Sequence, residues 1–438
     1  MQWLSSYNLR GNGSTVYGTD FLGTTDNVSL TLRANNVIGW RLAPSGTGIP
    51  NVIGGSSGNR VTSGVQGAAI GGGESGYPNS VTDDFGVVGG GALNQVGDNA
   101  GTTSDKRYAV VGGGWSNTAN GWASAIGGGD TNVAGKYCAV AGGRQNNATG
   151  EYAAIGGGWQ NTANNDYATV GGGNANTASG NRAIVGGGGQ NNASYWYATV
   201  GGGGANTASG AYATIPGGIS NSATMSYTLA AGRRAKANHD GAFVWADSTD
   251  ANFASSANNQ FLIRASGGIT MYTNSGATVG AELAPGSGSW ASVSDKNLKA
   301  NLAPTVARAI LARVATLPIQ TWNYTSQDAA IRHIGPIAQE FYAAFQVGED
   351  DRHISTVDAD GVALAAIKGL YEIVQEQEGQ IAALKAQNAA LDARLTALEQ
   401  SVGAAKSPTS DLLNNGWTIG ILLIAAIWVS RRYRGGAQ

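Results

Sequence analysis

An apolar β-branched residue followed by small residues recurs about every fifteen positions along the middle of the chain. These anchor positions are Val111, Ile126, Val140, Ile155, Val170, Val185, Val200 and Ile215. An asparagine follows each anchor by six positions, at Asn117, Asn132, Asn146, Asn161, Asn176, Asn191, Asn206 and Asn221. A tyrosine precedes most anchors by three positions, at Tyr108, Tyr137, Tyr152, Tyr167, Tyr197 and Tyr212. Looser copies begin at Ile53 and Val88. Such a fixed internal period predicts a solenoid.

A fifteen-residue unit is too short for a helix pair but holds two short strands and two tight turns. The stretch "YAAIGGG" alternates as a strand does, and its glycines permit positive φ or close backbone approach. Asparagine suits the second turn because it tolerates the left-handed region and bonds its own backbone. We therefore expect stacked coils in which each strand pairs with its copy about 4.8 Å away. Val, Ile and Ala would fill the narrow interior.

Two columns of the repeat have alternative interpretations. Cys138 occupies the position of Ala153, Ala168 and Ala213 in other repeats, which favours a small buried filler over a reactive thiol. The tyrosine column favours a structural ladder over a binding site.

The position four residues after each anchor varies, which predicts an outward-facing column. It reads Trp115, Asp130, Arg144, Trp159, Asn174, Gly189, Gly204 and Ile219. Exposed Trp115 and Trp159, together with Trp122 and with Trp196 in "YWY", could stack on the sugar rings of a cell-surface glycan. The alternative is that these tryptophans pack between protomers.

Residues 238–291 lose the period and gain aromatic and β-branched runs, which predicts a strand-rich neck. The composition changes again after Ser294. An amphipathic helix is expected in "TVARAILARVATL", a strand after Pro318, a strand and a helix in "RHIGPIAQEFYAAF", and a long helix from "ISTVDADGVALAAIKGL" onward.

A heptad repeat over residues 367–402 predicts a coiled coil. Its a positions are Ile367, Val374, Ile381, Asn388, Leu395 and Val402, and its d positions are Leu370, Gln377, Leu384, Leu391 and Leu398. Asn388 and Gln377 would fix the register at some cost in stability. β-Branched a positions with Leu at d favour dimers by rule.

After a linker at 403–411, the apolar stretch 412–430 is long enough for a tilted transmembrane anchor. Trp417 and Trp428 suit the two interfaces, and Arg431, Arg432 and Arg434 form a positive stop. The alternative is a hydrophobic tail buried in an oligomer. The arginines favour a cytoplasmic C-terminus with the shaft outside, although no secretion signal is visible at the start. A tail-anchored protein with a cytoplasmic shaft would avoid this conflict.

Composition narrows the classes of function. The 438 residues include 69 glycines and only 12% charged residues, with a net charge of -2. The glycines lack a collagen period, and near-neutral charge argues against a nucleic-acid partner. One cysteine and three scattered histidines predict neither a disulfide framework nor a Cys/His metal site, and no cofactor is expected. The few acids in the repeats (Asp130, Glu151 and Asp166) do not recur as a pair, which gives a glycosidase no support.

The repeats at 51–237 resemble the left-handed parallel β-roll heads of trimeric autotransporter adhesins and the shafts of related phage tail fibres. The triple glycine departs from the usual motif. In such relatives three chains bury their coils against one another, so the resemblance implies a homotrimer. A thin single roll has little core of its own, which also favours trimerisation.

Four motifs in order resemble the intramolecular chaperone domain of endosialidase type, found in phage tailspikes and in the membrane-bound myelin regulatory factor. They are "SDKNLK" (294–299), "WNY" (322–324), "HIGPIAQE" (333–340) and "TVDADGVALAAIKGL" (356–370). The resemblance covers 292–401 and implies a trimer that assembles upstream β-structure and then cuts itself off. Ser294 is then the nucleophile, Lys299 its base, and Val293–Ser294 the cleaved bond. The alternative is a helix N-cap at Ser294 or Asp295, and His333 is expected to be structural.

The expected fold is mostly β: a trimeric left-handed parallel β-roll or β-solenoid shaft, then a small α/β chaperone domain, a coiled coil and a C-terminal transmembrane helix. The expected segments are an N-terminal β segment (1–50), the shaft (51–237), the neck (238–291), a chaperone and autoprotease domain (292–366), the coiled coil (367–402), the linker (403–411) and the anchor (412–430). The predicted function is a fibrous adhesin or tail-fibre-like protein, released by a single-turnover serine peptidase with a Ser–Lys dyad. The alternative function is a non-cleaving, membrane-anchored stalk. The protein would sit at the cell surface or, alternatively, in a phage virion tail.

Overall fold

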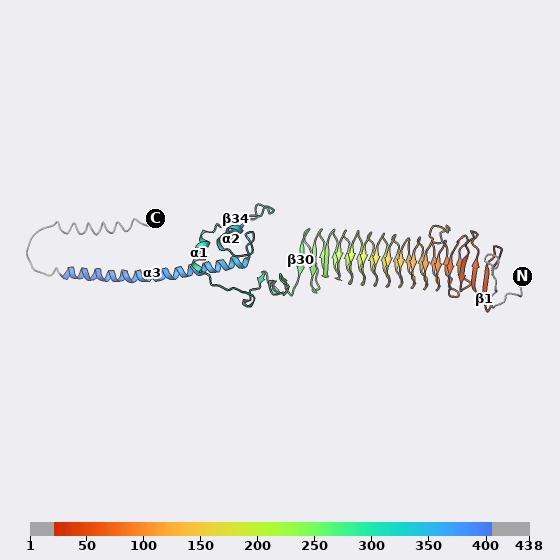
Figure 1. The fold of residues 1–438 in the computed structure, drawn as a ribbon, viewed down its shortest axis with the longest axis horizontal. Coiled ribbons are helices and arrows are strands. Elements are labelled where there is room, and N and C mark those ends of the chain that lie inside the picture. The colour runs from red at the N-terminus through yellow and green to blue at the C-terminus, as the bar shows by residue number, and fades with distance from the viewer. Residues whose placement is uncertain (1–21, 405–438) are drawn as a thin grey trace, which may run out of the picture. The chain divides into compact units, whose positions relative to one another are not determined.

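The computed structural model describes residues 22–404, which fall into two compact units. Within the described residues, the first unit contains 22–273 together with 280–291, and the second contains 274–279 and 292–404. The first unit is built of strands, and the helices belong to the second (Figure 1).

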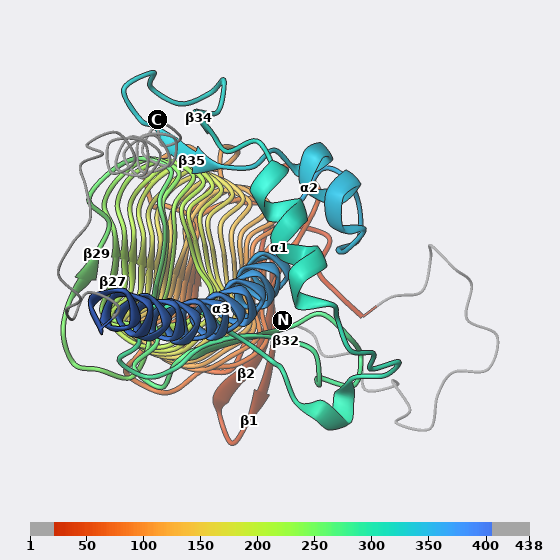
Figure 2. The same ribbon diagram turned by 90° about the vertical axis from the view of Figure 1, so that its left-hand side faces the viewer.

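The first unit is a parallel β-solenoid with two strands in each regular coil. One sheet contains β5 (Ala69–Ile70), β7 (Val87–Val88), β9 (Val110–Val111), β11 (Ala125–Ile126), β13 (Ala139–Val140), β15 (Ala154–Ile155), β17 (Thr169–Val170), β19 (Ile184–Val185), β21 (Thr199–Val200) and β23 (Thr214–Ile215). The other contains β4 (Arg60–Val61), β6 (Ser80–Val81), β8 (Gln95–Val96), β10 (Thr118–Ala119), β12 (Val133–Ala134), β14 (Asn147–Ala148), β16 (Thr162–Ala163), β18 (Thr177–Ala178), β20 (Asn192–Ala193), β22 (Thr207–Ala208) and β25 (Ser222–Ala223). Each strand pairs with its equivalent in the next coil, and the coils superpose when seen end-on (Figure 2). The sequence prediction of a β-solenoid is confirmed.

Antiparallel strands close the N-terminal end of this stack. β1 (Leu30–Ala34) pairs with β2 (Val37–Ala43), and β2 pairs with β3 (Asn51–Gly54). β3 then pairs in parallel with β5, so the change of direction lies between β2 and β3.

The parallel stacking continues beyond residue 237 into the segment expected to form a neck. The last coils before this point contain β24 (Gly218–Ile219), β26 (Leu229–Arg233) and β27 (Ala235–Ala237), and the segment beyond it contains β28 (Phe243–Ala246), β29 (Phe253–Ala254) and β30 (Phe261–Arg264). β28 pairs with β26 on one side and β30 on the other, and β29 pairs with β27, all in parallel. An antiparallel pair follows, β31 (Ile269–Tyr272) with β32 (Gly280–Leu283), and β33 (Ala291–Ser292) is the last strand of their sheet.

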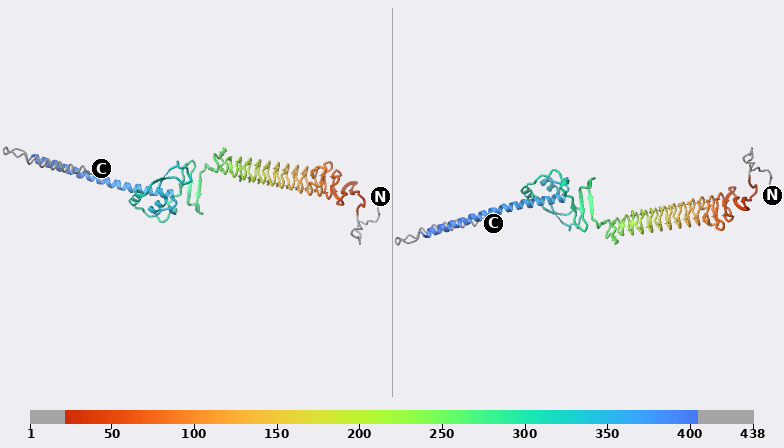
Figure 3. Two further views of the ribbon diagram at one scale, coloured as in Figure 1. Left: turned by 90° about the horizontal axis from the view of Figure 1, so that it is seen from above. Right: turned by 90° about the horizontal axis from the view of Figure 1, so that it is seen from below.

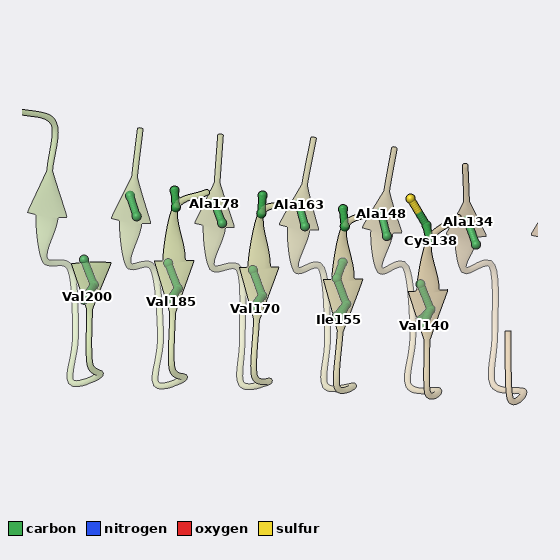
Figure 4. Close-up of a cluster of buried hydrophobic side chains, with 14 of the residues drawn as sticks. Ala134, Cys138, Val140, Ala148, Ile155, Ala163, Val170, Ala178, Val185 and Val200 are labelled. Carbon is green, nitrogen blue, oxygen red and sulfur yellow. The ribbon is translucent and has the colours of Figure 1, made fainter. Parts of the chain in front are cut away.

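The interior is one column of branched side chains with two columns of small ones, one of them containing Ala148 and Ala163 and the other Ala153, Ala168 and Cys138. The anchors Val140, Ile155 and Val170 point inward from one sheet, and Ala148 and Ala163 point inward from the other (Figure 4). Cys138 lies among them, 1% exposed, and its Sγ donates to the carbonyl of Gly150 at 2.7 Å. Burial raises the pKa of this thiol, which keeps it protonated at neutral pH. It is a filler, as the repeat predicts.

The repeated asparagine holds neighbouring coils together, which corrects the role expected for it. Asn176 is fully buried, and its Nδ2 donates to the carbonyls of Gly172 and Gly188 at 2.9 and 3.0 Å. Its Oδ1 accepts the backbone N–H of Asn191 at 3.0 Å. The left-handed φ of this turn belongs instead to the preceding residue, Ala175, at 54°. The asparagine is therefore a bridge between coils and not the turn residue.

The same bonds extend along the whole shaft as an asparagine ladder, from Asn59 to Asn221. From Asn94 to Asn221, the glycine three positions before each asparagine fits against this ladder. At Gly173, φ is 94°, and a Cβ would lie 2.8 Å from Nδ2 of Asn176. A side chain there would be strained and would also collide, which explains the last glycine of the triple.

The tyrosine column is the stacked ladder that the sequence predicts. Tyr137, Tyr152 and Tyr167 stack with ring centroids 4.8 and 5.1 Å apart. Arg182 takes the next position and lies 5.1 Å from the ring centroid of Tyr167 and 5.4 Å from that of Tyr197. These residues have positive φ, 59° at Tyr167, a conformation that costs a non-glycine residue about 1 kcal/mol or more. Ring stacking and the bond from each backbone N–H to the previous coil, 2.8 Å from Tyr167 to Glu151, offset that cost.

The second unit is a small α/β domain followed by one long helix. It contains η1 (Lys296–Leu298), α1 (Ala307–Thr316), β34 (Gln320–Trp322), β35 (His333–Gly335), α2 (Ala338–Phe345) and α3 (Thr356–Ala404). α1 packs against α3, where a Cβ on Gly369 would lie 2.6 Å from the carbonyl oxygen of Ala307. Arg308 also reaches across to Glu376, with Nη1 2.8 Å from Oε2. The glycine therefore allows the two helices to approach closely.

α3 continues as a single helix through the heptad region (Figure 3). Its apolar a and d side chains are exposed in the single chain, from 39% at Val374 to 63% at Leu398. Among residues 22–404, no helix has the length and apolar character of a membrane span. The predicted anchor at 412–430 and most of the linker lie outside the described residues.

Replacing Asn176 with Ala should lower the stability of the shaft. The substitution leaves the carbonyls of Gly172 and Gly188 and the N–H of Asn191 without their buried partner, at about 1–3 kcal/mol for each unsatisfied group. Thermal unfolding of the full-length protein, followed by circular dichroism at a β-sheet wavelength, measures the effect. Asn174→Ala is the control, because Asn174 is exposed in the same coil. Equal melting temperatures for the two variants would refute the role given to the ladder.

Replacing Gly369 with Ala should destabilise the second unit, because α1 must move away from the new methyl group. Overpacking of this kind costs about 1–3 kcal/mol. Gly379→Ala is the control: it lies in the same helix with open space around it and should stabilise by up to about 1 kcal/mol. Melting followed at 222 nm reports mainly on these helices. A Gly369→Ala protein that melts no lower than the parent would show that the close helix contact does not matter.

Candidate active site

The segment that carries Ser294 and Lys299 is a single tight turn. Asp295 caps η1, with its Oδ1 accepting the backbone N–H of Asn297 at 2.9 Å. The backbone N–H of Leu298 then donates to the carbonyl of Asp295, and that of Lys299 to the carbonyl of Lys296. Because the chain turns once and then extends again at Lys299, the side chains on either side of the turn come together. The N-cap predicted as an alternative is thus present, and Asp295 provides it.

The turn brings the amine of Lys299 onto the hydroxyl of Ser294. Nζ donates to Oγ at 2.6 Å, which is a short hydrogen bond. The cap and the Ser–Lys pair therefore exist together in one turn. Val293, on the other side of the Val293–Ser294 peptide bond, is 42% exposed.

A serine–lysine pair performs nucleophilic chemistry only when the amine is neutral. A neutral amine accepts the hydroxyl proton, whereas an ammonium can only donate to the hydroxyl. Burial or a nearby cation favours the neutral form of a lysine in general. In the single chain Ser294 and Lys299 are both exposed, so the geometry of the pair is present without the burial.

The motifs at 322–324 and 333–340 lie in the β34–β35 hairpin and at the start of α2. β34 and β35 pair antiparallel, with Trp322 opposite His333. His333 lies 4.8 Å from the indole of Trp322 and 6.0 Å from the ring of Tyr324, and its Nε2 is 3.1 Å from Oε1 of Gln327. These contacts are those of a structural residue, as expected for His333.

The structure separates the four tryptophans proposed to bind a ligand. Trp115 and Trp159 lie in the outward column, where parallel β-bridges join successive coils. The ring centroids of Trp115 and Tyr77 are 5.0 Å apart. The Nε1 of Trp159 donates a hydrogen bond to Oε1 of Gln145 at 3.0 Å. Trp122 and Trp196 lie in the other turn of the coil, next to the tyrosine column, and five coils apart along the stack. Trp122 lines a groove, described below, while Trp196 is 59% exposed.

Sequence reasoning missed a cluster of charged residues near Trp122. The carboxylates of Asp83, Asp98 and Asp105 have oxygens within 4.8 Å of one another. Nζ of Lys106 lies 3.8 Å from Asp98 and 3.4 Å from Asp105, so a lysine already balances part of this charge. No motif joins these positions; the available signal was the longer interval between the anchors Val88 and Val111.

Comparison with known proteins identifies a family likeness in the second unit. Residues 294–347 match the family described as "Chaperone of endosialidase". The match begins at Ser294, includes the first three motifs and ends before the fourth, at 356–370. None of the curated proteins compared with the chain matches it. The chain therefore combines a β-solenoid with a segment near its C-terminus that is similar to the endosialidase chaperone.

Proposed function

We propose that the protein is a trimeric, fibrous adhesin or tail-fibre-like protein whose second unit assembles the trimer and then cleaves Val293–Ser294 to release the shaft. The observation that carries the proposal is the 2.6 Å contact between Lys299 Nζ and Ser294 Oγ, at the first residue of the family match. A cut at this bond would separate the solenoid and its last strands from the chaperone-like segment.

The reaction proposed is an acyl shift followed by hydrolysis. Neutral Lys299 accepts the Ser294 hydroxyl proton, and Oγ attacks the carbonyl carbon of Val293. The carbon–nitrogen bond of the peptide breaks, the Ser294 nitrogen takes the proton, and Val293 is held as an ester on Oγ. Water then attacks the ester, which leaves a carboxylate on Val293 and a free amine and hydroxyl on Ser294.

Association of three chains would supply what the single chain lacks. The exposed a and d side chains of α3 form an apolar seam whose natural occupants are the same seams of other copies. Asn388 and Gln377 on that seam would set the register of the coiled coil. Packing around η1 in the trimer would remove water from Lys299 and favour its neutral form, so that cleavage follows assembly.

The alternative function is a membrane-anchored stalk that keeps its chaperone domain. The exposure of both Ser294 and Lys299, with the Asp295 cap satisfied, favours this reading. In either case the protein is expected at a cell surface or, if it is a tail fibre, in a virion. Residues 412–430 are the expected membrane contact. The expected partners are two further copies of the chain, a glycan on the shaft and no nucleic acid.

Denaturing gel electrophoresis of the full-length protein separates the two functions. Cleavage at Val293–Ser294 produces fragments of 293 and 145 residues from the 438-residue chain. Ser294→Ala and Lys299→Met should each give a single full-length band, because one lacks the nucleophile and the other the base. Ser292→Ala is the matched control and should be cut like the parent, because Ser292 lies two residues from the nucleophile.

If the parent protein stays intact, self-cleavage is excluded and the membrane-anchored stalk is the remaining function. A parent that is cut while Ser294→Ala is cut equally well would assign the reaction to another residue or to a contaminating protease. Sequencing the new amino terminus of the smaller fragment should give Ser294 as its first residue.

A further inference from the structure

We propose that a groove on the shaft beside Trp122 binds an uncharged saccharide. The groove has a volume of about 740 Å³ and crosses four consecutive coils at the turn next to the tyrosine column. Its lining includes Asp98, Asp105, Lys106, Asn120, Trp122 and Lys136. The volume lies within the range of about 300–1,000 Å³ that is usual for small-molecule sites.

The groove arises from two irregularities of the repeat at the same turn. In the coil of Trp122, four residues separate the buried Ala119 from the buried Ser124. The coil before it has twelve residues between Val96 and Ala109, and the coil after it has three between Ala134 and Cys138. A long turn therefore lies on one side of Trp122 and a shortened turn on the other. The hollow follows directly from these differences in length.

The long turn is held by buried carboxylates. Asp83 is fully buried, and its oxygens accept the backbone N–H groups of Lys106 at 3.2 Å and Asp98 at 3.3 Å. Asp84, 3% exposed, pairs with Arg107 at 3.3 Å. These bonds fix the wall of the groove in the absence of ligand, so binding does not have to order the turn.

The floor of the groove is glycine. A Cβ on Gly121 would collide with the backbone of Gly135, and a Cβ on Gly135 would lie 3.2 Å from the Cα of Thr149. The backbones of three coils are therefore close together beneath the opening. The lack of side chains here leaves room for a ring above the backbone.

Trp122 provides the aromatic surface. Its indole meets Tyr108 edge-on, with centroids 5.8 Å apart and planes at 73°, and the ladder position of its own coil is Ala123. The tyrosine ladder is thus interrupted at this coil, and it resumes at Tyr137, which is stacked on Tyr152. An indole with no parallel ring stacked against it suits the apolar face of a sugar, as aromatic side chains prefer stacked or edge contacts.

The polar groups around the indole match hydroxyl groups better than a charged ligand. Two carboxylates (Asp98 and Asp105) and two ammonium groups (Lys106 and Lys136) line the groove, and Lys136 is also paired with Glu151 at 2.9 Å, so positive charge is not in excess. The carboxylates of Asp98 and Asp105 are acceptors for hydroxyl groups. The amide of Asn120 adds both a donor and an acceptor. A groove without excess positive charge favours a neutral saccharide over a sialylated or sulfated one.

This inference rests on the proposed display of the shaft, but not on cleavage. Full-length protein should be applied to an array of neutral and sialylated oligosaccharides with glucose, mannose or N-acetyllactosamine cores. The strongest neutral binder should then be titrated by saturation-transfer NMR. We expect neutral glycans to bind in preference to their sialylated forms, and Trp122→Ala to weaken binding about tenfold or more. That factor corresponds to about 1.4 kcal/mol.

Trp196→Ala is the matched control, because Trp196 occupies the same turn position in a coil without the irregular turns. It should bind within about twofold of the parent, and both variants should melt at the parent's temperature. The proposal would be overturned if no glycan on the array is bound or if sialylated glycans are preferred. It would also be overturned if the two variants lose equal binding affinity. Because cleavage is scored separately on the gel, failure of binding and failure of the proposed function are distinguishable.

Discussion

The fold depends on one repeated interaction, the bond between a buried asparagine side chain and the backbone of the adjacent coils. Each coil contributes only two short strands, so the strand pairs alone fix few backbone groups. The side-chain amide of Asn176 donates hydrogen bonds to carbonyls of two coils, and its oxygen accepts a hydrogen bond from the backbone N–H of the next asparagine. A buried amide with all its bonds made cannot shift by one residue without losing them. The asparagines therefore set the register in which every other column lies.

That register determines what the surface presents. Because equivalent residues lie directly above one another, a repeated tyrosine becomes a stack, and an arginine in its place fits between two rings. By the same logic, a change in turn length appears on the surface without disturbing the interior. The eight additional residues before Ala109 leave the strand β9 in line with β7 and β11, with Val111 buried. A regular interior thus permits irregular, chemically distinct turns.

Much of this was accessible from the sequence because the interior repeats strictly. The anchors, the alanine column with Cys138, and the tyrosine ladder all follow from the fifteen-residue period. The role of the asparagine did not follow, because a turn residue and a bridging residue leave the same one-dimensional pattern. The end of the solenoid could not be predicted either. The coils from Phe243 to Arg264 keep the parallel strand pairing but lack the repeated asparagine and glycine residues. At the site, the five-residue spacing of Ser294 and Lys299 allowed contact, but only the turn made by η1 establishes it. The groove residues could not be found from the sequence because their proximity depends on the turns of four coils.

The asparagine ladder completes the hydrogen bonds within one chain, but the apolar seam of α3 remains exposed in that chain. We therefore expect the second unit to join identical chains, and that assembly to complete the site around Ser294. The most direct measurement is the mass in solution of the uncut Ser294→Ala protein, by multi-angle light scattering. A trimer has three times the 44.3 kDa mass of the chain, and this is the expected result. A folded species of 44.3 kDa would contradict it.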